Sequence, residues 1–148
     1  MIEPLSTLEL KIAERRNGRK FLDFVVNKES VFDLVGYQFD TVSCIASWPN
    51  MEETFKSVDR LLLREPADFR NNRCSLYVCG ECGGLDCGAV SLIIEEHEDT
   101  ILWREFGHER DWENDLEKFE EIGPFVFNKE QYVKKLESSI QLLQNSDN

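Results

Sequence analysis

Three apolar runs separated by short connections constrain the fold of this chain more than any other feature. The runs are CSLYVC at 74–79, AVSLIIEE at 89–96 and TILWREF at 100–106. Short apolar runs bounded by turn residues are typical of β-strands, and the polar turn His97 to Asp99 is short enough to join antiparallel neighbours. The sequence therefore predicts a three-stranded antiparallel meander in the second half of the chain.

A β-hairpin is predicted for residues 7–27. Apolar residues alternate with polar ones at 8–12, and the run at 21–26 places Leu22, Phe24 and Val26 on one face and Phe21 and Val25 on the other. Asn17-Gly18 between the two runs is a strong turn signal. A cluster of basic residues falls at the expected tip of this hairpin: Arg15, Arg16, Arg19 and Lys20.

Helices are predicted at three places by residues that cap helix N-termini. Ser30 caps a short helix that ends at Gly36, Asn50 caps a helix that ends before Pro66, and Asn128 caps a C-terminal amphipathic helix. A short oxygen-bearing side chain at such a position accepts a hydrogen bond from a backbone N–H that has no partner inside the helix.

Together these elements predict one α+β domain spanning 1–148. It contains an antiparallel sheet with an N-terminal hairpin and a central meander, and helices packed on one face. A further strand is expected around 41–45, and 107–121 is expected to form a loop or a weakly packed helix. A chain of 148 residues that is 41% hydrophobic can bury one core without disulfide bonds.

The cysteine content and the absence of long apolar segments predict a cytoplasmic protein. No secretory leader opens the sequence, and no apolar run is long enough to cross a bilayer. The chain has five cysteines. Because thiols stay reduced in the cytoplasm, an odd number of cysteines favours metal binding, redox chemistry or buried thiols over a disulfide framework.

The net charge of −12 disfavours contact with nucleic acids and with anionic membranes. Residues 95–121 hold twelve acidic side chains against three basic ones. Such a segment serves either as a solvated surface that keeps the protein soluble or as a surface that meets a basic protein partner. The residues expected to contact such a partner are Glu105, Glu109, Asp111, Glu113 and Asp115.

The segment VCGECGGLDCGAV at 78–90 carries the pattern Cys79-x2-Cys82-x4-Cys87 among four glycines. Two cysteines at this spacing on a glycine-rich bend can share one tetrahedral zinc ion, and Cys87 is a candidate third ligand. A closed structural site needs four ligands. The candidates for the fourth are Cys74, His97, His108 and Asp86, and His108 is preferred because its strand returns to the cysteine end of the sheet.

Two other interpretations of the cysteines remain open. A redox centre requires a thiolate of low pKa, but Glu81 and Asp86 flank the thiols and are expected to raise their pKa. Alternatively, the segment is only a glycine-rich connection whose cysteines pack as small apolar side chains under the edge of the sheet.

The cysteine segment also carries a resemblance. LYVCGECGGLDCGAVSLIIE, with LLLREPAD before it and ILWREFG and FEEIGPFVFNKEQYVKKLE after it, resembles a family of small uncharacterised bacterial proteins with a Cys-x-x-Cys-Gly-x-x-x-Cys-Gly-Ala turn. In size and charge the chain is also similar to immunity proteins, which cover the basic active sites of toxic nucleases with acidic residues.

Three hypotheses for function follow. The first is a non-enzymatic, cytoplasmic binding protein of the immunity type that neutralises a basic toxin. The second is a zinc-binding module that uses Cys79, Cys82, Cys87 and His108. The third is a thiol oxidoreductase.

Overall fold

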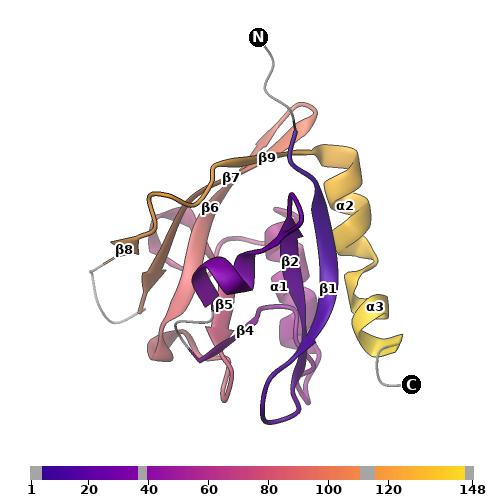
Figure 1. The fold of residues 1–148 in the computed structure, drawn as a ribbon, viewed down its shortest axis with the longest axis vertical. Coiled ribbons are helices and arrows are strands. Elements are labelled where there is room, and N and C mark those ends of the chain that lie inside the picture. Colours follow the sequence, from indigo (N-terminus) through magenta and orange to yellow (C-terminus); the bar gives the residue numbers. More distant parts are fainter. Residues whose placement is uncertain (1–4, 37–39, 111–115, 146–148) are drawn as a thin grey trace.

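The computed structural model describes residues 5–36, 40–110 and 116–145. Two antiparallel sheets and three α-helices form an α+β fold, as predicted (Figure 1). The smaller sheet has the order β1-β2-β3, and β1 and β2 are the predicted hairpin. The bounds are β1 Leu8–Glu14, β2 Lys20–Val26 and β3 Glu29–Ser30.

The larger sheet contains the predicted meander, β5-β6-β7. Strand β4 pairs with β5 on one side of the meander, while β8 and β9 both pair with β7 on the other side. Strand β7 runs on to Glu109, so the first part of the predicted loop at 107–121 is strand. The bounds are β4 Thr41–Ser43, β5 Arg73–Cys79, β6 Ala89–His97, β7 Thr100–Glu109, β8 Glu117–Lys118 and β9 Phe125–Asn128.

The α-helices are α1 Glu52–Leu61, α2 Lys129–Glu137 and α3 Ser139–Asn145. Asn128 is the N-cap of α2, as predicted, and its Oδ1 accepts a hydrogen bond from Gln131 N at 2.9 Å. The prediction for α1 is wrong by one residue: Met51 is its N-cap, and the preceding Asn50 accepts a hydrogen bond from Glu52 N through Oδ1 at 3.0 Å. The C-terminal helix, expected to be continuous, is divided at Ser138 into two helices. Short helices of other types are labelled η: the π-helix η1 Phe32–Gly36 and the 3-10 helices η2 Arg70–Asn72 and η3 Leu85–Cys87.

One apolar core is shared by both sheets and the helices. Trp103 of β7 lies at its centre and makes edge-on ring contacts with Phe24 of β2 and Phe127 of β9. The Trp103 indole N–H donates to the Tyr132 hydroxyl at 3.1 Å, and this hydroxyl donates to Leu61 O at 2.6 Å. These bonds connect β7, α2 and α1, while α2 contacts β1 and α3 contacts β2 (Figure 1).

A smaller apolar cluster lies under the cysteine segment. It is formed by Phe21, Val42, Ala46, Phe69, Val78 and Ala89, with Trp48 and Leu85 packed against it. The two sheets meet here, because Phe21 of β2 forms a bridge with Ala46 and Leu22 N donates to Ile45 O at 2.9 Å. The loop that follows β5 is therefore supported by residues from both sheets.

Candidate metal centre at the cysteine turn

The cysteine turn, residues 79–88, runs from the last residue of β5 to the start of β6, as predicted. Gly83 and Gly88 have φ angles of +71° and +100°, which L side chains rarely adopt. At Gly83 the chain closes a turn, with its N–H donating to Cys79 O at 2.9 Å. The two glycines let the turn fold back, so that Cys79 at the end of β5 lies close to Cys82 and Cys87.

Three sulfur atoms converge at this turn. The Sγ atoms of Cys79, Cys82 and Cys87 all lie within 4.8 Å of one another, and those of Cys82 and Cys87 are 3.6 Å apart. Two thiolates bound to one tetrahedral zinc ion, each about 2.3 Å from it, have sulfurs about 3.8 Å apart. The spacing therefore suits a shared metal ion, and it is too long for the ~2.05 Å bond of a disulfide.

The three thiols differ in exposure and in proton affinity. Burial, the largest single influence, raises the pKa of Cys79, but hydrogen bonds from the backbone N–H groups of Cys82 and Glu81 and from the Cys82 and Cys87 thiols together lower that pKa. The pKa of exposed Cys87 is raised to about 12, first by its contact with the Cys82 sulfur and then by that with Cys79. The expectation that Glu81 and Asp86 raise the thiol pKa is therefore wrong for Cys79, where hydrogen bonds from backbone amides and neighbouring thiols lower it.

The hairpin tip docks on this turn through Arg15. Its guanidinium donates to Asp40 Oδ1 at 2.9 Å and to Glu81 Oε1 at 3.1 Å, and only 8% of the side chain is exposed. Gly80 makes room for it, since a Cβ at Gly80 would lie 2.3 Å from Arg15 Nε. One residue of the predicted basic cluster thus anchors the cysteine turn to the hairpin.

The four candidates for a fourth ligand lie in different places. His108 pairs with Val90 across β6 and β7, next to the turn, whereas His97 lies at the opposite end of β6. A Cβ at Gly88 would lie 2.8 Å from His108 Nε2. His108 therefore returns to the cysteine end of the sheet, as predicted.

Among the described residues, the structure brings together three potential metal ligands at this turn and no fourth. The sulfurs of Cys79, Cys82 and Cys87 lie within 4.8 Å of one another, and the potential ligand atoms of His108 and Asp86 are outside this group. Cys74 is buried on β5 opposite Leu92 and is also outside the group, as its spacing from Cys79 predicts.

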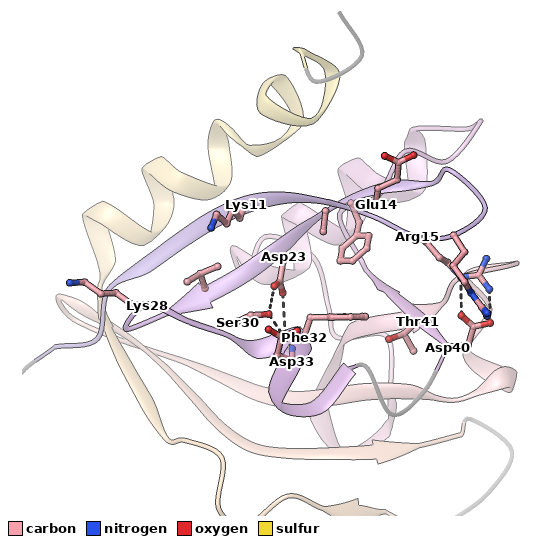
Figure 2. Close-up of a pocket in the computed structure, with 14 residues that line it drawn as sticks. Lys11, Glu14, Arg15, Asp23, Lys28, Ser30, Phe32, Asp33, Asp40 and Thr41 are labelled. Atoms are coloured by element: carbon pink, nitrogen blue, oxygen red, sulfur yellow. Dashed lines mark hydrogen bonds and ion pairs between the residues drawn. The ribbon is translucent and has the colours of Figure 1, made fainter.

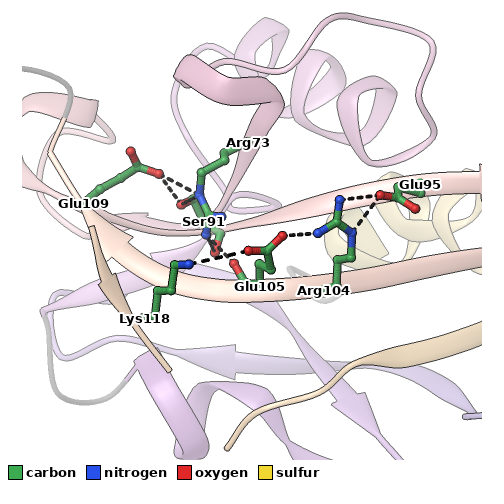
Figure 3. A network of polar contacts seen from close by, with 7 residues as sticks. All are labelled: Arg73, Ser91, Glu95, Arg104, Glu105, Glu109 and Lys118. Atoms are coloured by element: carbon green, nitrogen blue, oxygen red, sulfur yellow. Dashed lines mark hydrogen bonds and ion pairs between the residues drawn. The ribbon is translucent and has the colours of Figure 1, made fainter. Parts of the chain in front are cut away.

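The predicted acidic partner surface is altered by the burial of Glu109. Its side chain is 4% exposed, and its Oε2 atom lies 3.0 Å from Arg73 Nε and 2.5 Å from Ser91 Oγ (Figure 3). The expectation that Glu109 contacts a partner is therefore wrong, because its carboxylate neutralises a buried arginine. No local pattern in the sequence indicates this pairing, since the two residues are 36 positions apart.

The other residues predicted for that surface have separate outcomes. Glu105 is exposed, and its carboxylate pairs with Arg104 and, at 3.7 Å, with Lys118 (Figure 3). Its φ of 55° falls at an irregularity in the pairing of β6 with β7, where its carbonyl oxygen accepts a hydrogen bond from Arg73. Asp111, Glu113 and Asp115 lie outside the described residues.

A groove of about 970 Å³ runs along the hairpin beside η1 (Figure 2). Asp23, one of its lining residues, accepts hydrogen bonds from Ser30 Oγ, from the Tyr77 hydroxyl at 2.8 Å and from Phe32 N at 3.2 Å. Burial raises the pKa of this carboxyl group. These bonds hold η1 against β2 and β5, so the polar groups of the groove serve the fold.

Within the described residues, no helix has the length and apolar character needed to cross a membrane. Comparison of the chain with protein-family models, curated proteins and solved structures found no significant match. The resemblance of the cysteine segment to a bacterial family therefore stays a prediction.

Proposed function

We propose that this protein binds a thiophilic divalent metal ion, preferably zinc, through Cys79, Cys82 and Cys87. The observation that supports this is the convergence of three sulfur atoms within 4.8 Å on one turn. Zinc prefers thiolate ligands in tetrahedral geometry. Three ligands from the turn would leave a fourth position for water or for a group from outside the turn, and His108 is the adjacent side chain best suited to approach it.

The chemistry of the turn fits this proposal. One of its three thiols already has a lowered pKa, and each thiol must lose its proton to bind zinc. Cys82, Asp86 and Cys87 are exposed, so the turn has few apolar contacts of its own above the cluster at Phe21. A metal ion would cross-link the turn and would thereby replace the packing that it lacks.

Metal content tests the proposal directly. Protein purified without chelators should hold about one equivalent of zinc by elemental analysis, and Cys82→Ser should lose most of it. Cys74→Ala is the matched control, because Cys74 is buried on β5 outside the sulfur group. A cobalt-substituted sample should show sulfur-to-metal charge-transfer absorption. A zinc content below about a tenth of an equivalent, even after zinc is added and excess removed, would contradict the proposal.

A second proposal is capture of a basic protein, such as a nuclease-type toxin, as immunity proteins do. Its support is the net charge of −12 together with exposed carboxylates near the β6–β7 turn, in β8 and after β8. Glu109 is excluded from this surface by its burial. The exposed carboxylates are Glu96, Glu98, Asp99, Glu117, Glu120 and Glu121.

Charge reversal tests this second proposal. A basic partner captured from the parent cell should bind less tightly as salt rises, because exposed charges are screened. Replacing Glu98, Asp99 and Glu120 with lysine should weaken that binding, whereas Glu65→Lys, at an exposed position after α1, should not. Binding that is insensitive both to salt and to the triple replacement would refute the proposed surface.

A further inference from the structure

A cavity of about 380 Å³ opens beside the cysteine turn. It lies between α1, the segment that precedes this helix, and the turn itself, with Cys82 and Gly83 on one side. Its volume is in the range of small-molecule sites, which are mostly apolar with a few placed polar groups. The metal proposal does not involve this space, although the two share Cys82 as a boundary.

The apolar side of the cavity is a braced aromatic wall. Trp48 lines it together with Pro49 and Leu85. The guanidinium carbon of Arg19 lies 4.0 Å from the centroid of the Trp48 ring, and a Cβ at Gly83 would lie 3.1 Å from Trp48 Cζ2. The indole is therefore held in place by contacts from the hairpin and from the cysteine turn. A fixed aromatic surface of this kind favours a flat, apolar partner.

The polar side of the cavity is organised around Arg60. Its side chain is 16% exposed, and its nitrogens lie 3.5 Å from Asp68 Oδ2, 3.5 Å from Ser57 Oγ and 3.6 Å from Glu53 Oε2. Strong N–H···O bonds measure about 2.7–3.2 Å. The guanidinium therefore makes only long contacts with these three oxygens and retains donor capacity for a ligand.

Asp68 supplies an acceptor at the same place. Its two oxygens accept hydrogen bonds from Ser75 N at 2.8 Å and from Ser75 Oγ at 2.5 Å, which fix the orientation of the carboxylate. A carboxylate has about four acceptor positions, so these two bonds leave capacity for a further donor. A held carboxylate thus stands next to an arginine with unused N–H groups.

The charges select the class of ligand. One guanidinium is faced by the carboxylates of Asp68 and Glu53, so an added anion meets a local excess of negative charge. A neutral carboxamide or lactam suits both groups, because its carbonyl accepts from Arg60 while its N–H donates to Asp68. We propose that this cavity binds a small, uncharged molecule that joins a flat apolar ring to a carboxamide or lactam.

Benzamide is a minimal probe for this site. In ¹H–¹⁵N spectra of the full chain, we expect benzamide to shift the Trp48 indole signal and the amides around Arg60 in a saturable manner. Benzoate has the same ring but is an anion, and N,N-dimethylbenzamide keeps the carbonyl but lacks the N–H donors. Each should bind about tenfold more weakly than benzamide, because each loses a hydrogen bond to a charged group.

A pair of arginine variants completes the test. Arg60→Met should weaken benzamide binding about tenfold, whereas Arg64→Met, which removes an exposed arginine paired with Glu137, should leave it unchanged. The comparison of the three probes on the unaltered protein needs no variant to fold. The proposal would be overturned if benzamide gave no saturable shift, if its shifts mapped to the groove at Asp23, or if all three probes bound equally.

Discussion

Replacing Glu109 with alanine should lower the free energy of unfolding by about 3 kcal/mol. The substitution removes the carboxylate that neutralises Arg73, whose side chain is 3% exposed, and leaves a buried cation without its partner. Breaking a buried pair from one side costs about 3–5 kcal/mol. We expect the lower end of this range because Arg73 keeps two backbone acceptors, the carbonyl oxygens of Ser91 and Glu105.

Glu109→Gln separates charge from hydrogen bonding. The amide oxygen of glutamine can still accept from Arg73 or Ser91, so we expect a smaller loss, about 2 kcal/mol. Urea denaturation followed by tryptophan fluorescence measures both variants, since Trp103 is fully buried in the core. Glu105→Gln is the matched control: its carboxylate is exposed and ion-paired, and such pairs contribute about 0–1 kcal/mol.

The outcome also decides how the acidic surface can be probed. If the free energy of unfolding of Glu109→Ala were within about 0.5 kcal/mol of that of the unaltered protein, the pair with Arg73 would not support the fold. If the loss is as large as expected, charge reversal at Glu109 would weaken partner binding by destabilising the fold, whether or not Glu109 faces a partner. Tests of a partner surface should therefore use exposed carboxylates.

Three further predictions concern the groove and the cysteine turn. Because burial raises the pKa of Asp23, the folded protein binds the carboxyl proton more tightly than the unfolded chain does. The contribution of Asp23 to the free energy of unfolding therefore falls as pH rises above about 4. Urea titrations at a series of pH values should show this decline, and Asp23→Asn should remove it. In metal-free protein, iodoacetamide should modify Cys79 before Cys87 near neutral pH, as peptide mapping would show, and the reverse order would count against a thiolate at Cys79. Gly88→Ala should cost about 1–2 kcal/mol on urea denaturation, because φ is +100° and the new Cβ would meet His108; an unchanged midpoint would show that the turn can relax.

The elements of the fold follow from patterns that are local in the sequence. The alternation around Asn17-Gly18 predicts the hairpin, and the runs at 74–79, 89–96 and 100–106 predict the meander. Asn50 and Asn128 mark helix starts because their side chains bond to N–H groups two or three residues away. Each of these signals depends on neighbouring residues alone.

Strands that are short or irregular were not predictable in this way. Phe125–Asn128 forms β9 with only four residues, too few for an alternation to be recognised, and it is held by pairing with Thr100–Trp103. The break between α2 and α3 at Ser138 was not predictable either, because no glycine or proline lies there. Residues 107–109 continue β7, although their composition predicts a loop, because β6 and β8 pair with them.

The sequence by itself determined the class of the fold, the strand order of the meander and the identity of the three cysteines at the turn, because each depends on spacing along a short segment. Tertiary structure alone decided which charges are buried and which surfaces meet. It placed Arg73 against Glu109, Arg15 against Glu81, and Trp48 against Gly83. These pairs join residues far apart in the chain, and the free energy of a buried charge depends on all the groups around it, so no local pattern encodes them.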